Sequence, residues 1–212
     1  MVRRATRKER KRYTRKRNDI ILIAAEGKNK TEKNYFQEFN RSLNGCNIVF
    51  SNGNNTDPVK IVNDAVNTAK TKGVEVQNGD LVYAVFDTDF NKESQIKEAR
   101  KLADKNGVEL ILSNPCFEVW LLLHFRYSTR GYQSNHDVLN ESNNLWPAYH
   151  KSINSFRYLH DRCELAADNA RRLKRFSFET KGTEAVEKCN PSTDVYRLVS
   201  QIIHSGDNSH IQ

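Results

Sequence analysis

Two aspartates stand one residue apart at the end of an apolar run in the segment LVYAVFDTDFN, residues 81–91. The run is short and rich in aliphatic and aromatic residues, which is typical of a strand buried in a parallel sheet. Asp87 and Asp89 follow it directly. Two like charges held close together repel and raise each other's pKa unless a cation neutralises them. The pair therefore predicts a cation-binding site.

Other polar residues follow other predicted strands. Glu26 comes after the run DIILIAA, and Asn114 and Glu118 come after the run VELILS. In an open α/β sheet, ligands bind at the carboxyl ends of the strands. Glu26, Asp87, Asp89 and Glu118 are therefore expected to gather at one edge of the sheet. Oxygen ligands of this kind suit Mg²⁺ or Mn²⁺, which retain water and take further ligands from phosphate.

Each carboxylate also has a purely structural interpretation. An aspartate after a strand often forms a turn or caps the next helix, and Asp89 could do so. Glu26 could stabilise the positive end of the following helix dipole. Glu118 lies in a mostly apolar helix opened by Pro115 and could be a paired core charge, because a buried carboxylate needs a cation, a donor or water. Their joint placement favours the metal interpretation.

Strands and helices alternate along the part of the chain that must position these residues. A helix is expected to start near Thr31, whose hydroxyl could cap it, and another is signalled by Asp57 as its cap, Pro58 in its first turn and Gly73 at its end. A third covers KESQIKEARKLADKN and ends at Gly107. The predicted strands cover residues 19–25, 46–51, 80–86 and 108–113. Strands joined by crossover helices predict an α/β fold, a parallel sheet with helices on both faces.

The positive charge of the chain is concentrated at its start. Of 34 basic and 26 acidic residues, ten basic residues and only Glu9 fall within residues 1–17, so the rest of the chain is nearly neutral. Such a block repels itself and is expected to be disordered alone. We interpret it as an arm that binds the phosphates of nucleic acid; the alternative is a solubilising extension. Its basic residues are Arg3, Arg4, Arg7, Lys8, Arg10, Lys11, Arg12, Arg15, Lys16 and Arg17.

Several classes of protein are disfavoured by composition. No apolar run approaches the ~20 residues of a membrane span, and none fits a signal peptide. The four cysteines are far apart and form no C-x-x-C pair, which argues for reduced thiols in the cytoplasm rather than disulfides or zinc. No His-containing metal spacing and no G-x-x-x-x-G-K-[ST] motif occur, so any ATP hydrolysis would belong to a partner.

The C-terminal part carries fewer signals. Residues 126–150 are polar and are expected to form a loop-like excursion over the carboxylate edge. A long helix is predicted from Lys151, ending in the basic cluster RRLKRF (171–176), and a final helix follows around Leu198. His124 and His150 could act as bases, although a hydrogen-bonded structural histidine is the more frequent outcome.

Four ordered segments of the chain resemble the RloB-like family. They are ILIAAEGKNKTEKNYF, YAVFDTDF, LILSNPCFEVWLLLHF and NPSTDVYRLV, within residues 18–203. The resemblance implies a Toprim-like nuclease fold of bacterial defence loci, often encoded beside an ATPase. It implies that Glu26 is the Toprim glutamate, that Asp87 and Asp89 bind the metal, and that Glu118 is an additional acidic residue. In the family pattern Lys30, Thr31 and Glu32 line the same edge, where Lys30 could contact phosphate.

Together these observations predict three regions: a basic arm (1–18), a Toprim-like α/β core (19–125), and an excursion with C-terminal helices packed on the core (126–212). The expected function is a Mg²⁺- or Mn²⁺-dependent nuclease that cleaves RNA or DNA as the effector of an anti-phage, abortive-infection system. Glu26 would be a metal ligand or general acid/base. An ATPase partner and a homo-oligomer stay open. The alternatives are a D-x-D glycosyltransferase or phosphatase, and a non-catalytic module that binds nucleic acid or an ATPase.

Overall fold

The computed structural model describes residues 19–27, 30–42, 46–88, 91 and 93–207 of the 212-residue chain. Within these ranges it forms one five-stranded sheet in the order β2-β1-β3-β4-β5. The strands are β1 (Asp19–Ala25), β2 (Cys46–Phe50), β3 (Leu81–Asp87), β4 (Glu109–Asn114) and β5 (Ser192–Thr193). The first four are parallel, and the short β5 pairs antiparallel with β4. The predicted α/β fold and its four strands are confirmed; the antiparallel edge strand was not predicted.

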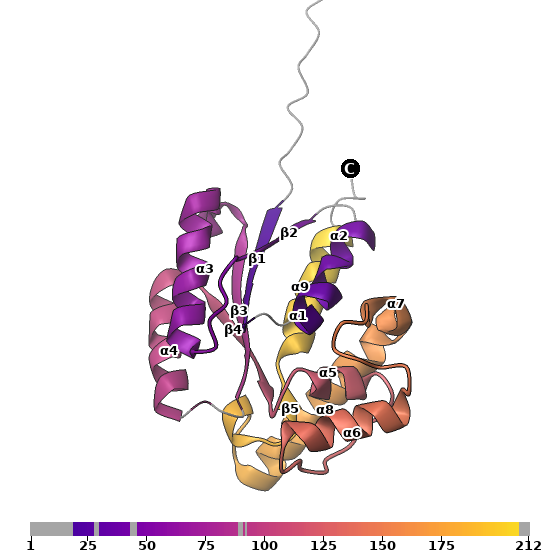
Figure 1. Cartoon of the computed structure of the whole chain (residues 1–212). Helices are drawn as coiled ribbons and strands as arrows, with labels where there is room; N and C mark the ends of the chain where they lie inside the picture. Colours follow the sequence, from indigo (N-terminus) through magenta and orange to yellow (C-terminus); the bar gives the residue numbers. More distant parts are fainter. Residues whose placement is uncertain (1–18, 28–29, 43–45, 89–90, 92, 208–212) are drawn as a thin grey trace, which may run out of the picture.

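Crossover helices lie on both faces of the sheet, as Figure 1 shows. On one face lie α3 (Pro58–Lys72) and α4 (Glu93–Asn106), and on the other lie α1 (Lys30–Gln37), α2 (Phe39–Ser42) and α9 (Val195–Asp207). The predicted signals of α3 are present: the Asp57 side chain accepts a hydrogen bond from the Lys60 amide at 3.0 Å, and Gly73 ends the helix with φ +63°. Such a cap contributes about 1 kcal/mol to the helix.

Alternate residues of each strand belong to two separate cores. Ile21 and Ile23 of β1 face a core with α1 and α9, whereas Leu22 and Ala24 face a core with α3 and α4. All four are fully buried. This period of two follows from the pleat of a strand, and burial on both faces explains the continuous apolar sequence that revealed the strand.

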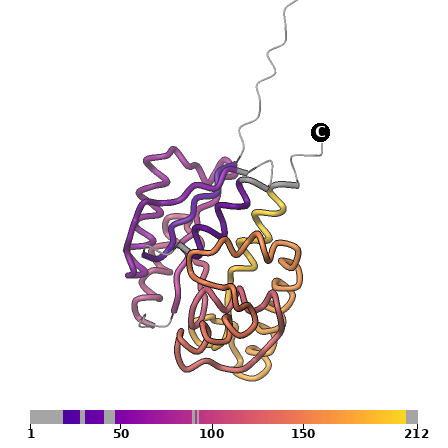
Figure 2. The backbone as a smooth tube through the Cα atoms, turned by 45° about the vertical axis from the view of Figure 1, so that its right-hand side comes forward, coloured from indigo at the N-terminus to yellow at the C-terminus, as the bar shows by residue number. Residues whose placement is uncertain are grey.

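The C-terminal half adds a group of helices beside the sheet, drawn from pink through orange to yellow in Figure 2. These are α5 (Glu118–Leu123), α6 (Asn135–Leu145), α7 (Phe156–Leu159) and α8 (Cys163–Lys181), with α9 returning along the sheet. Short 3₁₀ turns cover Val76–Asn78, His160–Arg162 and Val186–Lys188. No helix among the described residues is long and apolar enough to cross a membrane.

Three local predictions are wrong. Thr31 lies inside α1 and its hydroxyl donates to the carbonyl of Lys151 at 2.9 Å instead of capping the helix. Residues 126–150, expected to form a loop-like excursion, contain the helix α6, which is capped by Ser134. Val138 of this helix is buried in the core although the surrounding sequence is polar. The long helix predicted from Lys151 begins only at Phe156, and the 3₁₀ turn His160–Arg162 divides it into α7 and α8, although its apolar stripe is buried.

Candidate functional site

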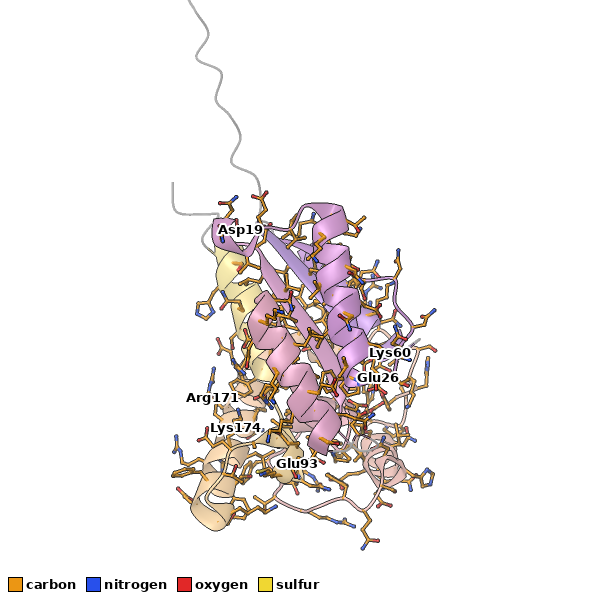
Figure 3. All side chains as sticks on the ribbon, turned by 90° about the vertical axis from the view of Figure 1, so that its left-hand side faces the viewer. Asp19, Glu26, Lys60, Glu93, Arg171 and Lys174 are labelled. Carbon is orange, nitrogen blue, oxygen red and sulfur yellow. The ribbon has the colours of Figure 1, made fainter. Side chains whose placement is uncertain are left out.

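Glu26 and Asp87 meet at the carboxyl ends of two neighbouring strands. The Asp87 backbone amide donates a hydrogen bond to Oε2 of Glu26 at 3.1 Å, and the Glu26 amide donates to the Val85 carbonyl at 3.1 Å. Both side chains are half-buried. Figure 3 shows β1 running from Asp19 at one end of the sheet to Glu26 at the other. The sheet register therefore places the Glu26 carboxylate against the backbone of Asp87, which lies 61 positions further along the chain.

The backbone on either side of these residues is fixed by local bonds. Gly27 turns the chain out of β1 with φ +57°, a conformation that glycine adopts without steric cost, and its amide bonds to the Asn55 carbonyl at 2.7 Å. After β3, the Thr88 amide bonds to the Ser113 carbonyl at 2.9 Å, and the Asn91 side chain bonds to the Asp87 carbonyl at 2.7 Å. The backbone of Asp87 at the end of β3 is thus fixed by hydrogen bonds of its own amide and carbonyl and of the next residue, Thr88.

Glu32 is a third carboxylate at this edge. It lies in the first turn of α1 with only 3% of its surface exposed. Its pKa is raised to about 8, chiefly by burial and then by the nearby charges of Glu118 and Glu26, against the lowering effects of a backbone hydrogen bond and of Lys151. At neutral pH this carboxyl therefore retains its proton in much of the population when no cation is bound. Glu32 therefore lies within electrostatic reach of both Glu26 and Glu118, the first residue of α5 (Glu118–Leu123).

Glu118 begins α5 and is 4% exposed. The Tyr149 hydroxyl donates a hydrogen bond to its Oε1 at 3.0 Å, and Lys151 Nζ lies 3.9 Å from the same oxygen. The expectation that this carboxylate needs a cation, a donor or water is therefore met by two residues about thirty positions further along the chain. Burial raises the pKa of Tyr149, and the Glu118 charge raises it further, so the phenol stays protonated and donates.

The segment that carries Tyr149 and Lys151 is tied to α1. Thr31 donates to the Lys151 carbonyl, and the Asn34 amide donates to the Ser152 carbonyl at 3.3 Å. The Lys151 backbone is thereby fixed beside the carboxylates, while its side chain is 61% exposed.

Cys116 lies between the two parts of the acidic group. It is a buried free thiol whose pKa is raised by burial and then by the charges of Glu118 and Asp87. A thiol in this environment remains protonated and does not supply a nucleophile. Since both charges raise its pKa, the side chains of Glu118 and Asp87 lie near the same sulfur.

Three further polar residues singled out in the sequence, Asn114, His124 and His150, are not part of the group of carboxylates. The Asn114 amide bonds to the Val186 carbonyl at 2.9 Å, which ties β4 to the last 3₁₀ turn. His124 is fully buried, its Nδ1 lies 2.9 Å from the Trp120 carbonyl, and burial lowers its pKa to about 4. It therefore stays neutral and has the structural role considered for it. His150 is exposed.

The basic cluster after Ala170 is not at the end of α8, because the helix continues to Lys181. The prediction that the long helix ends in this cluster is therefore wrong. Arg171 pairs with Asp168 at 2.8 Å and Lys174 with Asp194 at 2.6 Å, and Arg172 stacks over the Tyr127 ring at 4.1 Å. Figure 3 shows Arg171 and Lys174 to the left of α4 and Glu26 to its right.

Part of the predicted site lies outside the described residues. Asp89 and the basic residues of the arm belong to the undescribed ranges, and so does the side chain of Lys30, the first residue of α1. Within the described ranges, no three histidine, cysteine or acidic side chains are gathered closely enough to hold a metal ion by themselves. The described site therefore consists of the Glu26–Asp87 pair, with Glu32 and Glu118 beside it.

Sequence reasoning missed Tyr149 and Lys151, and treated Glu32 only as a residue lining the edge. The burial of Glu32 had a signal: it sits three residues before Tyr35 and four before Phe36, on the apolar face of α1. Lys151 and Tyr149 had none, because they reach Glu118 through tertiary packing of a segment without periodicity.

The comparison with known proteins gives a family. The model of the RloB-like protein family matches residues 21–202, so the chain belongs to this family. No curated protein and no solved structure shows significant similarity to the chain.

Proposed function

We propose that this member of the RloB-like family is a Toprim-type, metal-dependent nuclease that hydrolyses phosphodiester bonds in RNA or DNA. The observation that carries the proposal is the hydrogen-bonded meeting of Glu26 and Asp87 at the carboxyl ends of β1 and β3. A glutamate after the first strand and an aspartate after the third is the arrangement expected of that fold, and this edge is where open α/β sheets bind ligands.

The donor set fits a hard divalent cation. Glu26 and Asp87 offer carboxylate oxygens, the Asp89 side chain follows two residues later, and no nitrogen or sulfur ligand is needed. The pKa of Glu32 is raised first by burial and then by the charges of Glu118 and Glu26, and a cation bound nearby would oppose both effects. Glu26, Asp87 and Asp89 would hold Mg²⁺ or Mn²⁺, which polarises a phosphate and lowers the pKa of bound water.

The protein's own groups then have separable roles. Glu26 is close enough to the Asp87 backbone to be fixed in orientation, and it is the carboxylate best suited to be the general acid/base. Glu118 is oriented by Tyr149 and acts through its charge on the neighbouring Glu32. In the cell we infer a cytoplasmic defence effector that damages nucleic acid on infection, with an ATPase as the partner that hydrolyses nucleotide.

The test is a cleavage assay with an aspartate variant. Purified wild-type protein is incubated with single-stranded and double-stranded RNA and DNA in Mg²⁺ or Mn²⁺ and in excess EDTA. We expect cleavage that EDTA and Asp87→Asn both abolish, because the amide is a weaker and uncharged ligand. Asp104→Asn on the exposed far end of α4 is the matched control and should cleave normally.

The contrary results are equally specific. Full activity of Asp87→Asn, or full activity in EDTA, would refute a metal-dependent nuclease at this edge. Nucleic-acid binding without cleavage under all ionic conditions would instead support a non-catalytic binding module. Folding of each variant is checked by its melting temperature, which Asp87→Asn should leave unchanged or slightly raise, since it removes one of several repelling charges.

A further inference from the structure

We propose that Lys151 is the residue that contacts the phosphate of the nucleic acid at this site. The inference rests on the proposed nuclease function and adds to it a substrate contact that the sequence pattern did not indicate. Its basis is the position of the Lys151 ammonium, 3.9 Å from Glu118 Oε1 and close enough to Glu32 to lower the pKa of that carboxyl.

A group of carboxylates alone repels a phosphodiester. Glu26, Glu32, Asp87 and Glu118 are all acidic, and a phosphate that approaches them brings a further negative charge. Divalent metal compensates part of this charge, and a fixed side-chain cation compensates more. Lysine is a common phosphate ligand because its compact ammonium can donate in several directions.

The structure of the segment fits this role. Two side chains of α1, Thr31 and Asn34, hold the carbonyls of Lys151 and Ser152, so the backbone is fixed relative to the helix that carries Glu32. Beyond this fixed backbone, 61% of the Lys151 side chain is exposed, so a ligand can reach it from solvent. A lysine that served only to neutralise the buried Glu118 would be expected closer to the carboxylate and less exposed.

Glu118 does not depend on this lysine for a partner. Tyr149 donates to the same oxygen at the shorter distance of 3.0 Å, so the carboxylate keeps a hydrogen bond when the ammonium turns toward a ligand. When Lys151 contacts the substrate, the buried Glu118 carboxylate therefore still has a hydrogen-bond donor. This arrangement separates the structural donor, Tyr149, from the exposed cation, Lys151.

The experiment compares Lys151→Met and Lys151→Arg in the full-length protein, with Lys105→Met as the matched control. Lys105 is an exposed lysine in the last turn of α4, at the opposite edge of the sheet. The probe is a fluorescent, phosphorothioate-linked single-stranded oligonucleotide that resists hydrolysis, with affinity measured at several salt concentrations in Mg²⁺. Cleavage of the ordinary phosphodiester oligonucleotide is measured in parallel.

We expect Lys151→Met to flatten the slope of log affinity against log salt by about 0.7–0.9, the value for one lost phosphate contact. Its kcat/KM should fall by about 10²-fold, as when one charge-stabilising group is removed from an active site. Lys151→Arg should restore the slope and part of the activity, because it restores the charge. Lys105→Met should change neither quantity.

An unchanged salt slope in Lys151→Met would overturn the inference, and so would a loss of activity that parallels a loss of folded protein, which would make Lys151 a structural partner of Glu118. The binding measurement needs no turnover, so the two proposals fail separately. If wild-type protein cleaves nothing but Lys151→Met still flattens the slope, the nuclease proposal falls and the phosphate contact stands.

Discussion

The side chain of Glu26 accepts a hydrogen bond from the backbone amide of Asp87, at 3.1 Å, across the ends of β1 and β3. The bond orients the Glu26 side chain against the main chain of Asp87, so the sheet sets the position of this carboxylate relative to the Asp87 backbone. A carboxylate fixed in this way is suited to bind a cation, because it has little conformational entropy left to lose on binding.

Glu26→Gln should separate orientation from charge. The amide oxygen of glutamine can still accept from the Asp87 backbone, so the fold should persist, but the charge needed to bind a cation is lost. We expect the rise in melting temperature on adding Mg²⁺ to disappear and cleavage to fall by about 10²-fold or more. Glu98→Gln, on the exposed face of α4, should retain both. An undiminished Mg²⁺ response in Glu26→Gln would remove Glu26 from the metal site.

The pair Glu118 and Tyr149 gives a test of stability. Tyr149→Phe removes the donor at 3.0 Å and leaves a buried carboxylate with fewer partners, which should lower the free energy of unfolding by about 1–3 kcal/mol. Glu118→Gln keeps the shape and the acceptor and should change the melting temperature little while activity is lost. In the double variant the Tyr149→Phe cost should shrink, and denaturant unfolding of all four proteins measures this coupling. A Glu118→Gln loss of several kcal/mol, with activity that follows the folded fraction, would make Glu118 purely structural.

Glu32 predicts a dependence of stability on pH in the absence of metal. Its pKa is about 8 in the folded protein and near 4.5 when exposed, so the folded state binds more protons between these values. Its contribution to the free energy of unfolding is therefore fully present below about pH 4.5 and is lost as the pH rises toward 8, by at most about 1.4 kcal/mol per pH unit.

Urea denaturation of wild type and Glu32→Gln in EDTA tests this. The stability of the variant relative to wild type should increase from about pH 5 to about pH 8. His124, whose pKa is lowered to about 4 in the folded protein, titrates in this range only in the unfolded chain, and its contribution cancels in the difference between the two proteins. Mg²⁺ should reduce the effect, because a nearby cation favours the ionised carboxylate. A difference that stays constant with pH would show that Glu32 is already ionised in the folded protein.

Much of the fold could be predicted because its signals are local. The strands that carry Glu26 and Asp87 are buried on both faces and read as continuous apolar runs, and α3 has its cap at Asp57 and its stop at Gly73. Topology then placed the two carboxylates at one edge. By contrast, α6 could not be predicted, because its single deeply buried aliphatic residue, Val138, gives no helical stripe.

The residues around Glu118 depend on contacts between segments far apart in the chain. Burial alone implied that Glu118 had partners, but which residues they were depended on how the segment after α6 folds back on α1. Nothing in the spacing of Tyr149 or Lys151 encodes that contact. A charged residue in an apolar run is therefore a dependable signal that a partner exists, and a poor guide to which one.

The arm is predicted to supply affinity and no chemistry. Residues 1–17 carry the whole positive excess of the chain and none of the carboxylates of the proposed site. If about five of its ten basic side chains neutralise phosphates at once, deleting it should flatten the slope of log affinity against log salt by roughly 3–5. Turnover at saturating substrate should survive, because binding lost equally from ground and transition states raises KM and leaves kcat unchanged.

The control replaces the arm by an uncharged segment of the same length, which should behave like the deletion. A truncated protein with an unchanged slope would move the binding surface to the folded part of the chain. The exposed arginines of α8, among them Arg172 and Arg175, would then be the next residues to test.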